Sequence, residues 1–439
     1  MKNSRSSNPV SPYCTGCGAC VAVSGGALRM DWDDDGFLVP RRDNDAAIPE
    51  AAFDACPFLP GKTAASRDED ELAIAFLSGS VRKDPDIGLF NDTYIGYSKA
   101  YRNTSSSGGL ATYVFRQLLD RGIVDYIFVV TEGSSGYRYR LIGRGDELLD
   151  TSKTRYYPVT MSELFPLVAA LDGRVAVSGV ACFIKAIRLR QAEDPVMRDK
   201  IAFLVGIICG GLKSKFFTDY LADSAGAGPD YRKPEYRLKD AQSTSNDYSF
   251  SALDPAGREH RMKMSRVGDQ WGTGLFKAKA CDFCTDVLTE LADISLGDAW
   301  LPEYRKDGLG NSVIVTRSAL ADRIVTDGIA NGDLEARTCE PSQIIASQKP
   351  SFFHRRDALQ FRLWQTKLLG RPVPPVRKRV LRSISTPYAL VQVQREITRS
   401  RSFDIWRTTR SAAAFRQRMR PHLLILKVLT KINHILRRS

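Results

Sequence analysis

Three cysteines near the N-terminus occur at intervals of three residues, a spacing that can bind an iron–sulfur cluster. Cys14, Cys17 and Cys20 lie in the segment CTGCGAC, whose glycines allow a tight loop. Such a loop can present three thiolates to three irons of one cubane, and the fourth thiolate comes from a distant cysteine that is often followed by proline. Cys56-Pro57 matches that description. We therefore predict one [4Fe–4S] cluster on these four cysteines.

A structural zinc site is the alternative for the same four cysteines. Zinc is usually bound by two separated C-x-x-C pairs or by mixtures of cysteine and histidine, so the triple spacing favours iron–sulfur. In a two-cluster ferredoxin the run would continue with Cys-Pro after three intervening residues. Ser24 and Gly25 stand at those positions, so we expect this module to hold one cluster and not two.

Four further cysteines are candidates for a second site. Cys281 and Cys284 form a C-x-x-C pair. Cys209 ends the apolar run IAFLVGIIC, and Cys182 follows the run RVAVSG. If both runs are parallel strands, these two cysteines lie at carboxyl ends of strands, where open α/β sheets bind their ligands. The two could equally be buried small apolar residues, a common role for cysteine. Cys339 has no neighbouring cysteine and is expected to be structural.

The Ser-Gly-rich segment TSSSGG at 104–109 precedes a predicted helix. Free backbone N–H groups, hydroxyls and the helix dipole at such a start suit a pyrophosphate. The segment lacks the ending of a Walker loop and the spacing of G-x-G-x-x-G, and a Ser-rich helix cap is the simpler interpretation. The candidate binding residues in the segment are Thr104, Ser106, Ser107, Gly108 and Gly109.

Other residues later in the chain can complete such a site. They offer hydroxyls, a cation, an aromatic ring and a carboxylate, and two of them end another predicted strand. In chain order they are Ser152, Lys153, Tyr156, Ser178, Gly179 and Asp298.

From about 96 to 215 the sequence has the pattern of an α/β domain. Leu110, Val114, Leu118 and Leu119 fall on one face of a helix, and the β-branched run IVDYIFVV follows as a strand. The apolar runs RVAVSG and IAFLVGII are typical of strands buried in a covered sheet. The helix FIKAIRLRQAED lies between them, which predicts a parallel β-α-β unit.

A chain of 439 residues is long enough for two or three domains. We expect a fold of the α+β or α/β class in five segments. Residues 1–62 form a small module held together by its ligand, because it has few apolar residues. Residues 63–95 are a charged connector, 96–215 an α/β domain, 216–350 a second domain with the C-x-x-C pair, and 351–439 a basic helical tail.

Positive charge is concentrated in the tail. Residues 351–439 contain 21 Lys and Arg but only three acids, whereas the whole chain has 63 Lys and Arg and 50 acids. The rest of the chain is therefore slightly acidic, and we expect an anionic partner for the tail. Nucleic acid is a less favoured partner, because no nucleic-acid-binding fold accompanies the charge.

The last predicted helix of the tail is amphipathic. This pattern fits either an anionic membrane surface or packing on the body of the protein, and the sequence favours neither. The apolar residues at near-helical spacing are Leu423, Leu426, Leu429, Ile432 and Leu436.

The composition argues against several classes of protein. Only four histidines occur, three of them after residue 350, so a Ser/His/Asp hydrolase or a histidine metal centre is poorly supported. No run reaches the roughly 18 uncharged apolar residues of a spanning helix. The start MKNSRSSNPVSPY lacks the apolar core of a secretory signal. We expect a cytoplasmic protein with reduced cysteines, peripheral to the inner face of the membrane if its tail binds lipid.

Taken together, these motifs resemble the coenzyme F-420 hydrogenase/dehydrogenase beta-subunit family, which includes 7-hydroxymethyl chlorophyll a reductase and related iron–sulfur flavoproteins. The matching segments, in the family's order over roughly residues 13–310, are CTGCGAC with CPF, RNTSSSGG, SKTRYY, SGVACFIKAIR, ICGGL and CDFCTDVLTELADISLGDAW. The last of these is the most specific. Ser24 departs from the ferredoxin pattern, SKTRYY is looser than the family's Ser-Lys-Tyr pattern, and the basic tail lies outside the resemblance.

The resemblance implies a ferredoxin-like N-terminal module and an α/β flavin-binding body. It implies FAD near the Ser-Gly-Gly helix start and near Ser152-Lys153. It also implies a second [4Fe–4S] cluster, whose ligands would be Cys182, Cys209, Cys281 and Cys284.

The expected function is that of an iron–sulfur flavoprotein oxidoreductase. FAD would exchange two electrons with an organic substrate or with coenzyme F-420, and single electrons with the clusters. Lys153 is the best candidate for a proton donor. The expected electron partners are coenzyme F-420, a ferredoxin or a partner redox subunit. The sequence leaves the oligomeric state open, a homo-oligomer included.

Two other classes of protein remain as alternatives. A non-catalytic electron-transfer subunit of a larger complex would contain clusters but no flavin. A binding protein whose fold is stabilised by structural zinc would be colourless and would contain zinc without acid-labile sulfide.

Overall fold

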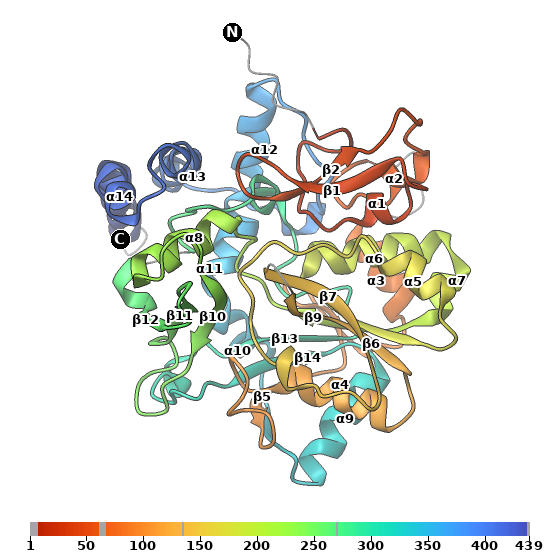
Figure 1. The fold of residues 1–439 in the computed structure, drawn as a ribbon. Coiled ribbons are helices and arrows are strands. Elements are labelled where there is room, and N and C mark those ends of the chain that lie inside the picture. The colour runs from red at the N-terminus through yellow and green to blue at the C-terminus, as the bar shows by residue number, and fades with distance from the viewer. Residues whose placement is uncertain (1–7, 61–66, 134–135, 269–270, 437–439) are drawn as a thin grey trace.

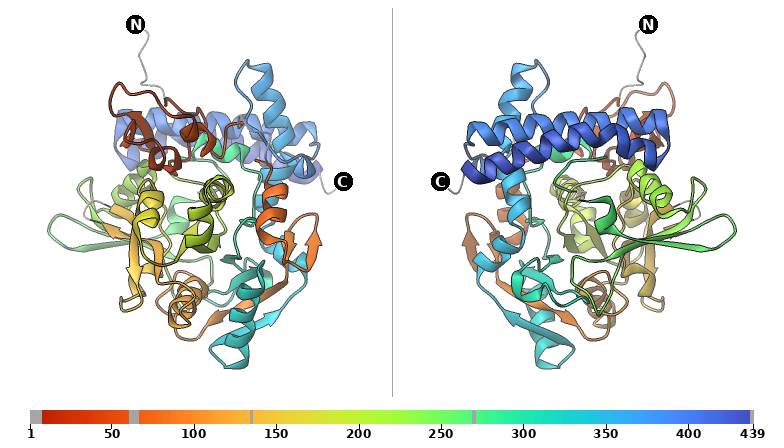
Figure 2. Two further views of the ribbon diagram at one scale, coloured as in Figure 1. Left: turned by 90° about the vertical axis from the view of Figure 1, so that its right-hand side faces the viewer. Right: turned by 90° about the vertical axis from the view of Figure 1, so that its left-hand side faces the viewer.

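The computed structural model describes residues 8–60, 67–133, 136–268 and 271–436, built around an eight-stranded sheet with helices on both faces (Figure 1). The N-terminal module and the helices of the tail lie at the same end of this body (Figure 1, Figure 2). The first seven residues, which belong to the segment expected to lack a secretory signal, and two arginines of the basic tail, Arg437 and Arg438, lie outside the described residues.

The central sheet mixes parallel and antiparallel pairs. The four central strands, β13, β9, β8 and β6, run parallel, and the strands outside them pair antiparallel. From one edge to the other the strands are β15 (Leu334–Thr338), β5 (Asp92–Ser98), β14 (Ser312–Thr316), β13 (Ile294–Asp298), β9 (Ile201–Ile207), β8 (Val175–Gly179), β6 (Tyr126–Gly133) and β7 (Gly136–Gly143).

The predicted β-α-β unit is confirmed. Strand β8 leads into α6 (Ala181–Glu193), and β9 returns parallel to β8. The predicted helix before β6 is α4 (Leu110–Asp120). We expected one domain to end near residue 215, and this position follows β9. Strands from before and after residue 215 nevertheless belong to the same eight-stranded sheet.

Alternate residues of the central strands face two separate apolar layers. On one face, Ile127 and Phe203 pack with α4 and with α9 (Ala319–Ala330). On the other face, Phe128 and Val175 pack with α6 and with three more helices. These three are α3 (Glu69–Leu77), α5 (Leu164–Ala170) and α7 (Pro195–Lys200). Cover on both faces explains why these strands are continuously apolar.

The N-terminal module consists of short elements that depend on the body for support. The backbone N–H of Met161, just before α5, donates to the carbonyl of Cys17 at 2.9 Å. The elements of the module are α1 (Ala19–Ala22), β1 (Leu28–Trp32), β2 (Leu38–Arg42) and α2 (Glu50–Asp54). The range 63–95, expected as a connector, contains α3 and the hairpin of β3 (Arg82–Asp84) and β4 (Gly88–Phe90).

A second, three-stranded sheet lies beside the central one. It is formed by β10 (Arg232–Leu238), β11 (Ser249–Leu253) and β12 (Glu259–Lys263), and α8 (Lys215–Ala225) packs on it. Short 3-10 turns connect the larger elements at Leu149–Thr151, Met264–Val267, Lys279–Phe283, Pro302–Tyr304 and Lys378–Val380.

The tail packs on the body. The side chains of Trp406, Phe415 and Met419 are buried with aromatic residues of α8, so the tail completes the core there. In the described ranges, every helix is too short or too polar to cross a membrane. Two short helices, α10 (Pro341–Ser347) and α11 (Lys349–Phe352), lead into the tail. The elements of the tail are a π-helical turn (Phe353–Asp357), α12 (Leu359–Leu368), α13 (Thr386–Thr409) and α14 (Ala412–Leu436), the last two lying side by side (Figure 2).

A buried network of ion pairs ties the tail to the body. Arg377 and Glu290 are both almost fully buried, and their side chains meet at 2.6 Å. Arg377 also lies 3.3 Å from Glu69 on α3, and Glu69 lies 3.1 Å from Lys185 on α6. Removing one partner from such a buried pair leaves an uncompensated charge, which is strongly destabilising.

The pKa of Glu69 makes this network sensitive to acid. Burial alone would raise the pKa of this carboxyl, but Lys185 and Arg377 outweigh it and lower the pKa from 4.5 to about 2. A carboxyl with a depressed pKa stabilises the folded state above its unfolded pKa, and this stability is lost as the pH falls toward the folded value.

We therefore expect Glu69→Gln to be less stable than the wild type at pH 6, and the gap to narrow by roughly 2 kcal/mol on going to pH 3. Urea unfolding at both pH values measures the gap. Glu71→Gln, at an exposed position of the same helix, is the matched control and should follow the wild type. A gap that stays constant with pH would contradict this role of Glu69.

Candidate functional site

The four cysteines of the N-terminal module line one pocket. Cys17, Cys20 and Cys56 are buried and Cys14 is half-buried, and all four border a space of about 330 Å³, its open mouth included. Pro57, which follows the last of them, also lines it. The structure thus brings together the four residues that the spacing predicted.

The loop that carries the first three cysteines depends on glycine. Gly18 has a φ of +78°, and a Cβ atom added there would lie 2.0 Å from Oγ1 of Thr160. A larger residue would therefore both strain the backbone and displace the neighbouring segment of the body. The close approach fixes the module against the residues that precede α5.

The environment of these thiols can stabilise negative charge. Burial raises the pKa of Cys14 to about 12 and that of Cys17 to about 11. Each of the four sulfurs nevertheless accepts a backbone N–H, for example that of Gly16 to Cys14 at 3.3 Å. Hydrogen bonds to sulfur are a feature of iron–sulfur sites, and a metal group would supply the positive charge that keeps the thiolates ionised.

The other four cysteines also come together. Cys182 and Cys209 follow β8 and β9 at adjacent carboxyl ends, and Cys281 and Cys284 approach them from the turn at 279–283. Burial, and then the neighbouring Cys284 and Cys281, raise the pKa of the Cys182 thiol well above its ordinary value. Backbone N–H groups again point at sulfur, at 3.2 Å for both Cys209 and Cys281.

The side chain of Arg355 lies beside this second set. It donates to the backbone carbonyls of Cys209 and Asp286. Burial opposes its charge, but the thiols of Cys284 and Cys209 outweigh burial and raise the pKa of Arg355. Among the described residues, no three His, Cys, Asp or Glu side chains converge closely enough to bind a single metal ion.

The two cysteine sets adjoin each other. The thiol of Cys17 also raises the pKa of Cys182, and Cys182 packs against the apolar cluster that contains Cys17. The hydroxyl of Tyr139, whose pKa is raised by burial, is close enough to both thiols to be affected by their charges. Cys17 and Cys182 therefore mark the point at which the first set meets the second.

The Ser-Gly-rich segment enters α4 without capping it through a serine. The residue before the helix is Gly109, in a left-handed conformation and with no side-chain cap. Ser106 instead accepts the backbone N–H of Thr154 at 2.9 Å, and Ser107 donates to the carbonyl of Asn311. The hydroxyl of Ser105 is buried and has no hydrogen-bond partner among the described residues.

The predicted segment around Ser152 lies against this loop. The backbone N–H of Ser106 donates to the carbonyl of Ser152 at 3.4 Å, and the Ser152 hydroxyl meets that of Thr112 at 3.0 Å. The ammonium of Lys153 lies 3.9 Å from the carboxylate of Glu235. These contacts bring Thr104 to Gly109 and Ser152 to Tyr156 into one region.

Asp298 joins the same region through an arginine that the sequence patterns did not identify. Arg237 donates to both carboxylate oxygens of Asp298, at 2.5 and 2.7 Å, and also to the hydroxyl of Tyr156. Its Nε atom is buried without a hydrogen-bond partner in the described part of the chain, as are Nε and Nη1 of Arg155. Unsatisfied buried donors beside a Ser-Gly-rich loop fit an anionic group such as a pyrophosphate.

Lys239 is the second residue that the patterns missed. Its ammonium donates to the carbonyls of Ser107 and Leu309, both at 3.0 Å, so it clamps the Ser-Gly-rich loop. Burial and the neighbouring Arg102 lower the pKa of Lys239 to about 7. Arg237 and Lys239 are two residues apart in the sequence. This local spacing does not predict that they lie beside a loop far earlier in the chain, near residue 107.

Ser178 and Gly179 lie with the second cysteine set. The carbonyl of Ser178 accepts the hydroxyl of Tyr139 at 2.9 Å, and Gly179 packs closely against Phe183 and Ile184. Both residues immediately precede the helix that carries Cys182. As residues of β8 they also pair with Val205 and Gly206 of β9.

Two models of one family match this chain. The model for the N-terminal part of the coenzyme F-420 hydrogenase/dehydrogenase beta subunit matches residues 93–165, and the model for its C terminus matches residues 172–342. Together they cover more than half of the 439 residues.

Three relatives come from Methanosarcina barkeri and Methanocaldococcus jannaschii. Coenzyme F-420 hydrogenase subunit beta of Methanosarcina barkeri is 23% identical over 59% of this chain and 85% of its own length. The F-420-dependent formate dehydrogenase subunit beta of Methanocaldococcus jannaschii is 22% identical over 62% of this chain and 67% of its own length. Coenzyme F-420-dependent sulfite reductase of the latter organism is 24% identical, but the match covers 36% of that protein.

A solved structure shares the fold. A chain of the F-420-reducing NiFe hydrogenase complex from Methanosarcina barkeri superimposes with a TM-score of 0.51 and 22% identity. The superposition covers 68% of this chain and 99% of the other.

Proposed function

The chain belongs to the coenzyme F-420 hydrogenase/dehydrogenase beta-subunit family, and from this premise we propose that it is an iron–sulfur flavoprotein that moves electrons between two [4Fe–4S] clusters and FAD. Its named relatives are beta subunits of a hydrogenase and of a formate dehydrogenase, so the family belongs to oxidoreductase complexes. The observation that carries the proposal is the pair of adjoining four-cysteine sets.

Two cubane clusters account better than zinc for the cysteine geometry. The ligands of one zinc ion must all approach a single point to about 2.3 Å, whereas each thiolate of a cubane binds its own iron. Four thiols that surround a pocket, each with a backbone N–H donor, suit the second arrangement. The first cluster would be held by Cys14, Cys17, Cys20 and Cys56, and the second by Cys182, Cys209, Cys281 and Cys284.

The neighbouring positions of Cys17 and Cys182 support electron transfer between the sets. FAD, when bound, supplies the conversion between two-electron chemistry on a substrate and one-electron chemistry on clusters. The residues proposed to bind it are Thr104, Ser106, Ser107, Gly108, Gly109, Ser152, Lys153, Tyr156, Ser178, Gly179 and Asp298. The buried unsatisfied donors of Arg155, Arg237 and Ser105 support this location.

The proposed electron partners are coenzyme F-420, a ferredoxin or a partner redox subunit. Relatives that are subunits of complexes favour a partner subunit. A non-catalytic electron-transfer subunit is the second candidate function, and the same relatives favour it. Flavin content distinguishes the two, because the second candidate requires clusters alone.

Substitution of single cysteines tests the two clusters separately. We expect about eight irons and one FAD in the wild type after anaerobic purification, and about four irons in Cys56→Ser and in Cys284→Ser. Iron, acid-labile sulfide and flavin assays measure these contents. Cys339→Ser is the control, because Cys339 belongs to neither set, and it should keep all eight irons. Zinc without sulfide in the wild type would contradict the proposal.

Lys153 is proposed both to bind the flavin and to donate a proton during turnover. We expect Lys153→Met to weaken FAD binding about tenfold, or about 1.4 kcal/mol, because one charged contact is lost. Fluorescence titration of the flavin-depleted protein gives the dissociation constant. Lys306→Met, at an exposed lysine, should bind FAD like the wild type. An unchanged constant in Lys153→Met would remove Lys153 from the site.

We also propose that α14 contacts an anionic membrane surface. The predicted apolar face of this helix is partly used for packing, since Leu426 is buried and Leu423 and Leu429 are half-buried. A second stripe is exposed, however, with Leu424 and Ile435 each more than half accessible. Exposed basic residues on the same helix, Arg420, Lys427 and Lys431, supply the matching charge.

Charge substitutions in the exposed stripe test this contact without removing buried tail residues such as Trp406. We expect the double variant Leu424→Glu, Val428→Glu to lose sedimentation with vesicles that contain phosphatidylserine. Ile74→Glu, at a position on α3 that is as exposed as Leu424, should still sediment. Failure of the wild type to sediment with these vesicles would reject the membrane contact.

A further inference from the structure

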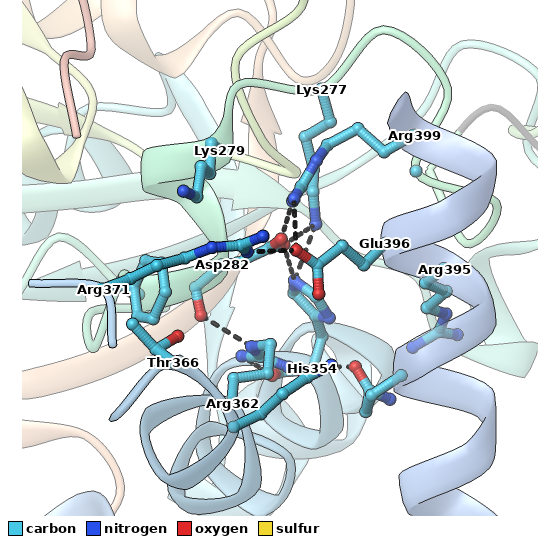
Figure 3. A pocket seen from close by; sticks show the side chains of 14 residues that line it. Lys277, Lys279, Asp282, His354, Arg362, Thr366, Arg371, Arg395, Glu396 and Arg399 are labelled. Carbon is cyan, nitrogen blue, oxygen red and sulfur yellow. Dashed lines mark hydrogen bonds and ion pairs between the residues drawn. The ribbon is translucent and has the colours of Figure 1, made fainter. Parts of the chain in front are cut away.

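A basic pocket lies where the tail covers the second cysteine loop (Figure 3). The space between its walls is about 490 Å³ when the open mouth is included. Its walls come from three segments: the loop at 274–283, the stretch from the π-helical turn through α12 to residue 371, and α13. The cationic residues are Lys277, Lys279, Arg362, Arg371, Arg395 and Arg399, and the acidic residues are Asp282 and Glu396.

The two carboxylates are already shared among several cations. Asp282 lies 2.7 Å from the ammonium of Lys277 and 3.4 Å from Nε2 of His354, and it also pairs with Arg399. Glu396 lies 3.1 Å from Arg371. Burial lowers the pKa of Lys277 well below its ordinary value, and the other five cations still outnumber the two carboxylates among the lining residues.

Polar donors at the pocket are left without acceptors. Gln392 is 3% exposed, and its carbonyl accepts from Arg362 at 3.0 Å, whereas its Nε2 has no hydrogen-bond partner among the described residues. Nε of Arg395 is likewise buried and unsatisfied there. A buried donor without an acceptor destabilises the folded state. An anion in the pocket would satisfy these donors and the excess positive charge together.

Compensation of the cysteine charge explains only part of this cluster. Lys277 and Arg399 interact electrostatically with Cys281, so they can neutralise thiolates of the second set. Arg371 instead pairs with Glu396 on α13, and the ammonium of Lys279 lies 5.2 Å from the ring of Tyr13. In Figure 3 the side chains of Arg371 and Arg399 approach Asp282 and Glu396 from opposite sides.

The π-helical turn at 353–357 sets up this arrangement. It directs three consecutive side chains to three places: His354 to the pocket, Arg355 to the second cysteine set, and Arg356 to Glu290 in the buried ion network. Such turns interrupt regular helices and often occur at functional sites. Most of the lining residues follow residue 350, beyond the family match that ends at 342.

We propose that this pocket binds a small multivalent oxyanion, a phosphorylated or multiply carboxylated molecule. Arginine forks match the oxygen geometry of phosphate and carboxylate groups, which selects this chemistry over chloride. The inference does not depend on the proposed redox function, since it rests on the cations and donors of the tail.

Calorimetric titration of the complete protein tests the proposal, with pyrophosphate and citrate as probes and chloride at equal ionic strength as the reference. We expect saturable binding of at least one probe, and the comparison of the two distinguishes phosphate from carboxylate ligands. The double variant Lys279→Gln, Arg395→Gln should bind at least tenfold more weakly. Arg416→Gln, Arg418→Gln removes the same charge from exposed positions of α14 and should bind like the wild type.

A second variant distinguishes loss of anion binding from loss of the folded structure. Gln392→Glu keeps the acceptor for Arg362 but places a negative charge in the pocket, so it should abolish probe binding while keeping the wild-type iron content. Absence of saturable binding to the wild type, or equal affinity in the pocket variants and the α14 control, would overturn the proposal. Iron and flavin assays on the same samples test the proposed clusters and FAD separately from anion binding.

Discussion

The rest of the structure depends on the burial of two adjoining sets of cysteine thiols. Burial and the neighbouring thiols of both sets raise the pKa of Cys182 well above its ordinary value. A protein that keeps such groups as thiolate ligands must supply positive potential around them. Here backbone N–H groups supply it at short range, and Arg355 supplies a full charge beside the second set.

The basic tail supplies much of this charge, which explains why it is integrated into the fold. Arg355, Arg356 and Arg377 are buried residues of the tail that contact the segment 286–290, which follows Cys284. Because these contacts also reach Glu69 on α3, the cysteine loop is held between early and late parts of the chain. A buried charge without a partner is strongly destabilising. The pairing of these charges therefore favours a single arrangement of the tail on the body.

The parallel part of the sheet determines where the sites lie. Cys182 and Cys209 follow adjacent parallel strands, and their carboxyl ends meet at one edge because those strands are neighbours. The Ser-Gly-rich loop lies elsewhere, between β5 and α4, and is clamped by Lys239 and by the segment around Ser152. The basic pocket forms beside the C-x-x-C loop, where α12 and α13 cover Asp282.

The sequence by itself determined what depends on short spacings. The loop of Cys14, Cys17 and Cys20, the helix at 110–120 and the β-α-β unit from 175 to 207 all follow from local periodicity and turn residues. Only the tertiary structure decided which distant residues meet. Arg237 reaches Asp298, Lys239 reaches Ser107, and Arg377 reaches Glu290, across separations that carry no local pattern. The same holds for the tail. Its positive charge can be counted from the composition, whereas the partners of each arginine depend on how α12 and α13 pack on the body.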